Sequence, residues 1–211
     1  MSKVLYGYWR SSAAYRVRIA LNLKGVPYKT QHVSLIDGAQ RSTEFLGINA
    51  QGLVPVWEDD GVCISQSLAI LEFLEEAYPE VSLLPDSLKD RALARQIALT
   101  IACDIHPLCN LRVLGYLKNK LSVNEESKLQ WYRHWVSEGL SALEQLVKGT
   151  AGEYCLGDKP TIADCCLVPQ LYNAERFDIS GDNWPTLRKI AEECRKHSAF
   201  IAAHPNNNQP D

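Results

Sequence analysis

The sequence lacks the features that would point to a nucleic-acid, membrane or exported protein. It has no cluster of basic residues of the kind that follows a phosphate backbone, and its formal net charge is -3, from 22 Lys and Arg against 25 Asp and Glu. No apolar run of signal-peptide length stands at its start, and no segment approaches the length that spans a membrane. We therefore expect no nucleic-acid or membrane partner and a cytoplasmic location.

The cysteines lack the spacing of a metal site or a disulfide framework. Seven are present, an odd number, and none forms a C-x-x-C pair or a Cys/His ligand pattern. Without an export signal, we expect them to be reduced thiols, buried as small apolar side chains. Cys103 and Cys109 fall at packing positions of a helical pattern. The sequence thus predicts no metal site.

What is present is a globular composition arranged in two different patterns. Of the 211 residues, 46% are apolar and 22% charged, which suits one large domain or two small ones. Short apolar runs alternate with helical periodicity over residues 1–82, whereas the periodicity is helical throughout from residue 88. We expect an N-terminal domain over 1–82, a linker at 83–87 and an all-helical domain over 88–211. In the helical domain, Thr161-Ile162-Ala163-Asp164 has the spacing of a capping box, which predicts a local helix start. The tail from Pro205 is polar, and we expect it to be frayed.

The N-terminal pattern predicts the element order of a thioredoxin-like domain. A strand leads into a helix that ends at Gly25, and a second strand over 28–35 completes a β-α-β unit with parallel strands. Two short apolar runs flank Asp60-Gly61, which predicts an antiparallel hairpin, and a helix follows that ends before Pro79. The expected fold class is therefore α/β plus all-α, with a βαβ-ββα domain followed by a helical domain.

The stretch from Tyr6 to Leu21 combines a strand, a tight turn and a helix, with Arg10, Ser11 and Ser12 at the turn. The first turn of a helix has N–H groups without intrahelical partners and the positive end of the helix dipole, so it stabilises an anion. Ser11 or Ser12 is either an ordinary N-cap or part of a turn that holds a thiolate. The stretch alone does not decide between the two.

Two further positions suit a small anionic peptide. Pro55 interrupts a strand, where it either blocks aggregation at an edge or, with a cis peptide bond, turns the backbone of Val54 toward a peptide ligand. Gln66 and Ser67 begin a helix, where they are either caps or donors to a carboxylate. Together with the first turn, these positions predict a site for an extended, anionic peptide.

On these residues the chain resembles the zeta-class glutathione transferases, the class that includes maleylacetoacetate isomerase and is related to maleylpyruvate isomerase. The resemblance extends over nearly the whole chain and is carried by Arg10-Ser11-Ser12 with residues 15–21, Val54-Pro55, and residues 66–70, 107–111 and 173–177. It implies a thioredoxin-like domain joined to an all-helical domain, usually as a homodimer, with glutathione as the cofactor.

The resemblance also implies which residues form the site. Ser11 and Ser12 would lie beside the glutathione sulfur, and Gln66 and Ser67 would hold its γ-glutamyl carboxylate. The other implied glutathione contacts are Gln40, Val54, Pro55, His106, Asn110 and Arg112.

A maleyl substrate carries carboxylates, so the resemblance also requires cations. We expect Arg10 and Arg176 to bind this substrate, with Arg10 acting beside Ser11 and Ser12 in catalysis. An ion pair is an equal alternative for Arg176 from the sequence alone, and a structural role is the commoner one for His106.

The implied function is the glutathione-dependent cis–trans isomerisation of maleylacetoacetate to fumarylacetoacetate in tyrosine and phenylalanine degradation. The hypothesis is a reversible addition of the glutathione thiolate to the double bond. The chain has Ala13 where many members of the class have cysteine, but the reaction requires a glutathione thiolate and not a protein thiol. The alternatives are a transferase that conjugates or dehalogenates small α-halo acids, a maleylpyruvate isomerase, and a non-catalytic interaction module.

Overall fold

The structure is a computed structural model that describes residues 3–210 of the chain. The chain divides into two compact units: unit 1 runs to Leu84 and also contains the segment from Arg195, and unit 2 is Pro85–Cys194. The sequence-based boundaries of 1–82, 83–87 and 88–211 remain a prediction. They differ from the two units chiefly in the C-terminal segment, which the sequence analysis assigns to the helical domain.

Unit 1 is built on a four-stranded sheet in the order β2-β1-β3-β4. The strands are β1 Val4–Gly7, β2 Lys29–His32, β3 Val56–Asp59 and β4 Val62–Ser65. β1 is parallel to β2 and antiparallel to β3, and β3 and β4 form an antiparallel hairpin. Asp60 and Gly61, both at positive φ, make the two-residue turn of that hairpin, as predicted. β2 is shorter than the expected strand and fully exposed because it forms an edge of the sheet.

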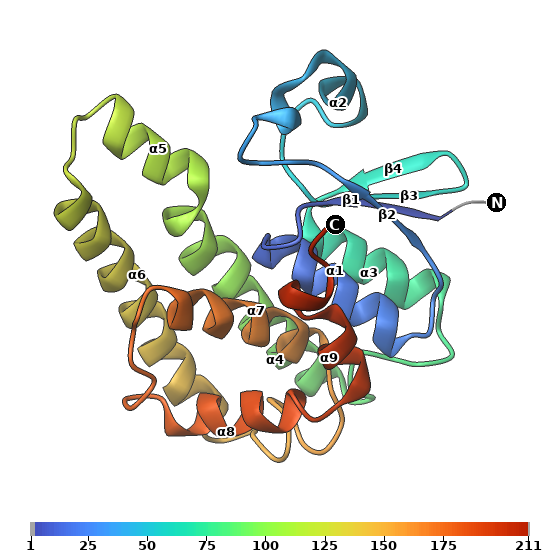
Figure 1. Ribbon diagram of the computed structural model, residues 1–211. Helices are drawn as coiled ribbons and strands as arrows, with labels where there is room; N and C mark the ends of the chain where they lie inside the picture. Colours follow the sequence, from blue (N-terminus) through green and yellow to red (C-terminus); the bar gives the residue numbers. More distant parts are fainter. Residues whose placement is uncertain (1–2, 211) are drawn as a thin grey trace. The chain divides into compact units, whose positions relative to one another are not determined.

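Helices cover both faces of this sheet. α1 Ser12–Leu23 and α3 Ser67–Ala77 lie on one face, and α2 Thr43–Ile48 lies on the other (Figure 1). The predicted end of α1 is confirmed: Gly25 has a φ of 64° and the N–H of Val26 bonds to the C=O of Leu21 at 2.9 Å. Under α2, a small apolar cluster forms around Phe45.

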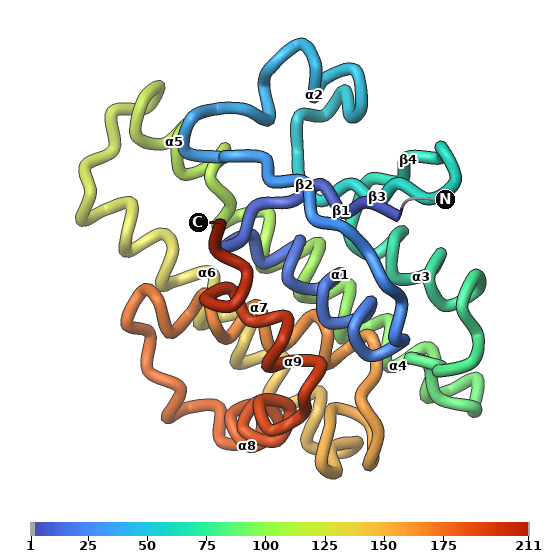
Figure 2. Tube along the Cα trace, turned by 45° about the vertical axis from the view of Figure 1, so that its right-hand side comes forward, coloured from blue at the N-terminus to red at the C-terminus, as the bar shows by residue number. Residues whose placement is uncertain are grey.

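The C-terminal segment packs beside α1 within unit 1, where both views place α9 Ser198–Ala203 (Figures 1 and 2). Arg18 Nε donates to the C=O of Ala203 at 3.0 Å, and Asn22 Nδ2 donates to the C=O of Ala199 at 3.1 Å. A buried arginine and a half-buried asparagine on α1 thus hold the segment, and this is why it belongs to unit 1.

The prediction of a frayed tail is wrong for residues 205–208. Pro205–Asn207 forms a 3₁₀ turn, and Pro205 is buried. Asn208 Nδ2 then donates to the carbonyls of Ala202 and His204 at 2.8 and 2.9 Å. The asparagine side chains that make this tail polar therefore donate hydrogen bonds to backbone carbonyl groups of the C-terminal segment. Asp211 lies outside the described residues.

Unit 2 is predominantly helical, as its periodicity predicts. Its helices are α4 Leu88–Leu99, α5 Leu111–Asn119, α6 Glu125–Val147, α7 Ile162–Arg176 and α8 Pro185–Cys194. Between α4 and α5 the chain passes through a π-helical turn, Thr100–Ile105, and a 3₁₀ turn, His106–Cys109. Asn110 is then extended, with ψ at 162°, so α4 and α5 are separate helices.

One helical run meets the criterion for a membrane span, which corrects the expectation that no segment approaches that length. By length and composition, the run Leu88–Asn119 qualifies, with 32 residues and a hydropathy of 1.4. It is weak evidence for a membrane, because core helices of other proteins pass the same test. The run is also interrupted by the extended Asn110.

Two buried carboxylates accept hydrogen bonds at the N-termini of helices in unit 2. Thr161 and Asp164 form the predicted capping box at the start of α7, and Asp164 also accepts from the N–H of Cys155 at 2.8 Å. Burial raises the pKa of Asp164, although its hydrogen bonds oppose this shift. Glu144 of α6 accepts from the N–H and hydroxyl of Thr186 and so caps α8 from a neighbouring helix.

The prediction of buried cysteines holds for four of the seven. Cys155, Cys165, Cys166 and Cys194 are buried, and Cys109 is half-buried. Cys63 and Cys103 are exposed, the former because β4 is an edge strand. No group of His, Cys, Asp and Glu suited to a metal ion occurs within residues 3–210.

Candidate active site

The register of the sheet brings three loops of unit 1 to one end. Tyr6 pairs with Val56, and Val56 pairs with Ser65. The end of β1, the start of β3 and the end of β4 are therefore neighbours. The turn into α1, the Val54-Pro55 segment and the start of α3 all leave the sheet there, so the three predicted positions lie together.

The turn into α1 contains the two serines. Ser11 is the N-cap, and its Oγ accepts from the N–H of Ala14 at 3.2 Å. Ser12 is the first residue of the helix and is only 4% exposed. The N-cap alternative thus holds for Ser11, but it does not exclude a ligand. A hydroxyl that accepts through its oxygen still has its own hydrogen to donate.

Arg10 stands beside this turn and is held by two aromatic side chains. Its Nη2 donates to the hydroxyl of Tyr8 at 3.2 Å, and its guanidinium lies 4.8 Å from the ring centre of Trp9. Arg10 forms no ion pair with any residue that the structure describes. Its charge and the α1 dipole therefore both favour an anion at this turn.

Val54 presents backbone groups without partners. The Val54-Pro55 peptide bond is cis, and Val54 precedes β3. Neither the N–H nor the C=O of Val54 makes a hydrogen bond within residues 3–210. An extended peptide beside Val54 would find one donor and one acceptor there.

The start of α3 has no side-chain cap. Gln66 precedes the helix with a φ of 73°, in the left-handed region that non-glycine residues seldom adopt, and its side chain makes no capping bond. Instead, Gln66 Nε2 donates to Gln51 Oε1 at 2.9 Å. Ser67 is the first helical residue, and its Oγ accepts from Nη1 of the buried Arg16 at 3.1 Å. The uncapped N–H groups and the Ser67 hydroxyl suit a carboxylate.

Gln40 brings a buried acceptor to the same loops. Its Oε1 is buried and has no hydrogen-bond partner in the described part of the chain. Gly52, with a φ of 59°, allows this approach, because a Cβ there would lie 2.8 Å from the backbone oxygen of Gln40. A buried amide oxygen without a partner is stabilised when it accepts a hydrogen bond from an N–H group of a ligand. The donor and acceptor set of unit 1 therefore fits a small anionic peptide such as glutathione.

Unit 2 contains the other predicted glutathione contacts, all between the start of the 3₁₀ turn and the first turn of α5. His106 begins the 3₁₀ turn, and Asn110 is the N-cap of α5, with Oδ1 accepting from the N–H of Arg112 at 3.1 Å. Trp131 Nε1 donates to the C=O of Leu108 at 2.8 Å and ties the turn to α6. The structure thus gives Asn110 a capping role and leaves its contact with glutathione, and those of His106 and Arg112, as predictions.

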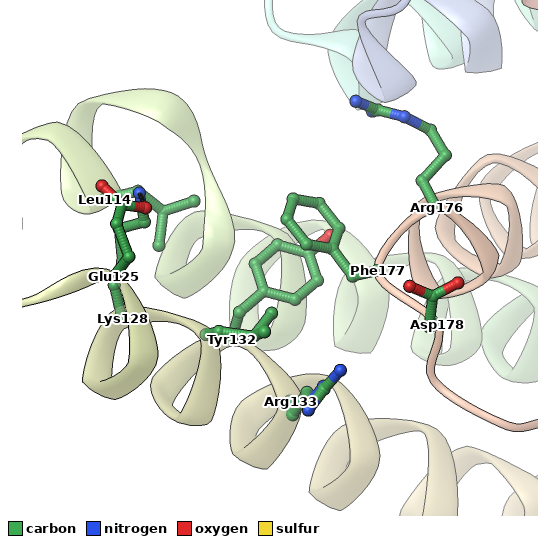
Figure 3. Close-up of a pocket in the computed structure, with 9 residues that line it drawn as sticks. Leu114, Glu125, Lys128, Tyr132, Arg133, Arg176, Phe177 and Asp178 are labelled. Carbon is green, nitrogen blue, oxygen red and sulfur yellow. Dashed lines mark hydrogen bonds and ion pairs between the residues drawn. The ribbon is translucent and has the colours of Figure 1, made fainter.

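Arg176 lines a cavity of unit 2 with a volume of about 320 Å³ (Figure 3). In its wall the rings of Tyr132 and Phe177 stack (Figure 3), with their centres 3.9 Å apart. The Arg176 guanidinium lies 5.8 Å from the centre of the Phe177 ring. Burial raises the pKa of Tyr132, so its hydroxyl stays protonated. Arg176 makes no ion pair among the described residues, so unit 2 gives it no carboxylate partner, and its contact with the substrate stays a prediction.

Comparison with known proteins identifies the class to which this fold and site belong. Residues 10–77 match the family model for the glutathione S-transferase N-terminal domain, and residues 130–199 match that for the C-terminal domain. A probable maleylacetoacetate isomerase of Vibrio cholerae serotype O1 is 51% identical over 213 residues, which cover 100% of this chain and 99% of that protein.

Two solved structures are similar along their whole length. A maleyl pyruvate isomerase, described as a bacterial glutathione S-transferase of the zeta class, has a TM-score of 0.95 and 40% identity over 99% of both chains. A maleylacetoacetate isomerase from Methylobacterium extorquens AM1, with bound malonate and glutathione, has a TM-score of 0.94 and 42% identity over 98% of both chains.

The fold is thus that of a glutathione transferase. Within that class, the chain belongs to the zeta-class family of maleylacetoacetate isomerases. The family resemblance, the fold class and the glutathione cofactor inferred from the sequence are all confirmed.

Proposed function

We propose that this protein is a glutathione-dependent isomerase that converts maleylacetoacetate to fumarylacetoacetate in tyrosine and phenylalanine degradation. The observation that carries the proposal is the full-length identity of 51% to a probable maleylacetoacetate isomerase. The donor set at one end of the unit 1 sheet supports it. Glutathione, when bound, supplies a thiolate that adds to the substrate double bond and leaves again after rotation.

The start of α1 favours the ionised sulfur. Ser11 is the better candidate for the donor, because it is more exposed than Ser12 and its hydroxyl hydrogen is not needed for capping. A hydrogen bond to a charged group contributes about 1.5–3 kcal/mol and a helix N-terminus about 0.3–1 kcal/mol. One pKa unit corresponds to about 1.4 kcal/mol, so together they lower a thiol pKa of about 8.5 by roughly one to three units.

The other residues of unit 1 hold the rest of the tripeptide. Val54 pairs with its backbone, and the orphaned oxygen of Gln40 accepts one of its N–H groups. The uncapped start of α3, with Gln66 and Ser67, takes the γ-glutamyl carboxylate. In unit 2, His106, Asn110 and Arg112 are assigned to glutathione by family resemblance.

Two arginines supply the positive charge that a maleyl keto acid requires. Arg10 and Arg176 are each held against aromatic rings and have no carboxylate partner among residues 3–210, so each can bind a substrate carboxylate. No protein thiol is needed: Ala13 replaces the cysteine that many members of the class have.

A second candidate substrate is maleylpyruvate. The TM-score of 0.95 to a maleyl pyruvate isomerase favours it, and it requires the same addition and rotation. The proposal also includes two family-based expectations, a homodimer and a cytoplasmic location. Sedimentation of the purified chain and fractionation of cells test these two expectations.

The test is to follow the absorbance of both maleyl substrates with and without glutathione. An isomerase converts them only when glutathione is present and leaves the total thiol concentration unchanged. A conjugating or dehalogenating transferase would consume thiol in proportion to product, and an interaction module would not be retained on immobilised glutathione. The larger kcat/KM identifies the preferred substrate.

The variant Arg176→Ala tests the substrate side of the proposal. Loss of a charge-assisted hydrogen bond should reduce kcat/KM by roughly tenfold or more. Arg188→Ala is the matched control, because Arg188 is an exposed arginine that pairs with Asp182 and lies outside the cavity. Equal losses in the two variants would contradict a substrate-binding role for Arg176.

A further inference from the structure

A buried arginine lies behind the start of α3. Arg16, on α1, is 1% exposed, and its Nη1 donates to Ser67 Oγ at 3.1 Å. Burying a guanidinium is costly unless its charge and its N–H groups find partners. Here one of those partners is a hydroxyl at the position proposed to hold the γ-glutamyl carboxylate.

The chemistry of the two groups fixes the direction of this hydrogen bond. A guanidinium has donors only, whereas a serine hydroxyl has one hydrogen and two lone pairs. Ser67 therefore accepts from Arg16, and its own hydrogen points away from that arginine. Because Ser67 is the first residue of α3 and the helix has no side-chain cap, this hydrogen joins backbone N–H groups that also lack a capping partner.

We propose that Arg16 is a positioning residue for glutathione, which orients the Ser67 hydroxyl so that it donates to the γ-glutamyl carboxylate. The inference rests on the proposed function, because it assumes that glutathione is the ligand of unit 1. Arg16 itself does not touch the ligand. The effect of Arg16 on glutathione binding is specific to the γ-glutamyl carboxylate and depends on the hydroxyl of Ser67.

The same helix offers a matched control. Arg18 is 2% exposed, but it donates to the backbone carbonyls of Ala203 and Trp9 and not to Ser67. Truncation of either arginine removes a buried guanidinium from α1. Only truncation of Arg16 should change how the protein distinguishes ligands with and without the carboxylate.

The experiment compares two ligands by calorimetry: glutathione, and γ-aminobutyryl-cysteinyl-glycine, which lacks only the γ-glutamyl carboxylate. In Arg16→Met, we expect the Kd for glutathione to rise about tenfold or more, as for a lost hydrogen bond to a charged group. The Kd for the analogue should change less than about twofold. Ser67→Ala should have the same pattern, and the double variant should be no worse than the stronger single variant.

Several results would overturn the proposal. Equal weakening of both ligands in Arg16→Met would mean a general structural effect, as would full additivity with Ser67→Ala. A similar loss of discrimination in Arg18→Met would show that any buried arginine of α1 acts this way. If Arg16→Met does not fold, Ser67→Ala alone tests the proposal, because the effect of Arg16 depends on that hydroxyl, and an unchanged ratio of the two Kd values in Ser67→Ala would refute it.

The isomerase assay separates failure of this inference from failure of the proposed function. A wild-type protein that binds glutathione but isomerises neither maleyl substrate would contradict the function, and the ratio of Kd values would still test Arg16. If the wild-type protein isomerises a maleyl substrate but Arg16→Met leaves the ratio of the Kd values for the two ligands unchanged, only the inference is contradicted.

Discussion

Two serine hydroxyls stand at the starts of α1 and α3, and each already accepts a hydrogen bond from the protein. Ser11 accepts from the N–H of Ala14, and Ser67 accepts from Arg16. Each hydroxyl therefore has its hydrogen left for a ligand. The proposed function uses the first for the sulfur of glutathione and the second for its carboxylate, so the same chemistry serves both ends of the tripeptide.

Substitution of Ser11 separates capping from thiolate stabilisation. Ser11→Ala should cost about 1 kcal/mol of stability, whereas glycine is nearly as good an N-cap and Ser11→Gly should cost a few tenths. Both variants remove the hydroxyl. We expect both to raise the pKa of the bound glutathione thiol by about one unit and to lower kcat/KM at neutral pH by about tenfold.

The measurement is a titration of the ultraviolet absorbance of bound thiolate, with the pH profile of kcat/KM beside it. A raised thiol pKa moves the acidic limb of that profile to higher pH. If activity instead followed stability, with Ser11→Gly close to wild type and Ser11→Ala impaired, the hydroxyl would be only a cap.

At the residue scale, the sequence revealed which chemistry is present but not how side chains are oriented. Ser11 and Ser67 could be found because caps and anion-binding groups are the same residue types at the same positions. The hydrogen bonds of Arg16 with Ser67 and of Gln66 with Gln51 join residues 51 and 15 positions apart. Helix and strand periodicity does not reveal which distant side chains meet, so the sequence did not identify Gln51 as a neighbour of the candidate site.

At the element scale, predictions succeeded where local chemistry sets the end of an element. Asp60-Gly61 and the Thr161 capping box are two examples, because the residues that stabilise each turn or cap are adjacent in sequence. The π-helical turn over Thr100–Ile105 was not predicted. Its pattern is that of an ordinary helix, and its geometry depends on packing within unit 2.

An ion pair joins the C-cap residue of α1 to α3 and makes the stability of unit 1 depend on pH. Lys24 Nζ lies 2.8 Å from Glu75 Oε2, and their side chains are 1% and 10% exposed. Burial alone would raise the pKa of Glu75, but hydrogen bonds from Lys24, Ser82 and the N–H of Leu83 outweigh it and hold the pKa below its ordinary value. The folded state therefore binds this proton less tightly than the unfolded chain does.

Glu75→Gln should accordingly lower the free energy of unfolding by about 1–3 kcal/mol at pH 7. The contribution of Glu75 is complete above its unfolded pKa of about 4.3 and is lost as the pH falls through the lower folded value. Denaturant unfolding of wild type and variant should thus converge as the pH falls from about 5 toward 3. A constant difference over this range would contradict the assignment.

Glu125 provides the control for this experiment. Lys118 and Lys128 lower its pKa to about 2, yet its side chain is 64% exposed. Solvent and salt screen exposed pairs, so Glu125→Gln should leave the unfolding midpoint nearly unchanged in spite of the larger shift. If Glu125→Gln lowered the free energy of unfolding as much as Glu75→Gln does, burial would not determine how much these ion pairs stabilise the protein.

At the scale of the whole molecule, the chain begins and ends in the same unit. α9 belongs to unit 1, although the residues between Pro85 and Cys194 separate it from α1 in sequence. Helical periodicity shows that a segment is amphipathic but not which surface it covers. For that reason the sequence assigns residues 195–211 to the helical domain. The family can be recognised, in contrast, because its motifs extend over nearly the whole chain.

Removal of residues 195–211 should therefore destabilise unit 1. Phe200 and Ala203 are 1% and 0% exposed, and burial of a phenylalanine side chain alone is worth about 3–5 kcal/mol against alanine. The deletion also takes the Ala203 carbonyl from Arg18, which holds the C=O of Trp9 next to the turn into α1. We expect a loss of about 3 kcal/mol or more in denaturant unfolding, with weaker binding of glutathione.

The matched control removes residues 209–211 only and leaves the 3₁₀ turn with its asparagine hydrogen bonds in place. This shorter deletion should unfold like the full-length chain, because Gln209 and Pro210 are exposed. If the longer deletion also unfolded like wild type, α9 would not stabilise unit 1. If it lost stability but bound glutathione with unchanged Kd, the hydrogen bond from Arg18 to Trp9 would be enough to keep the turn into α1 in place without the C-terminal segment.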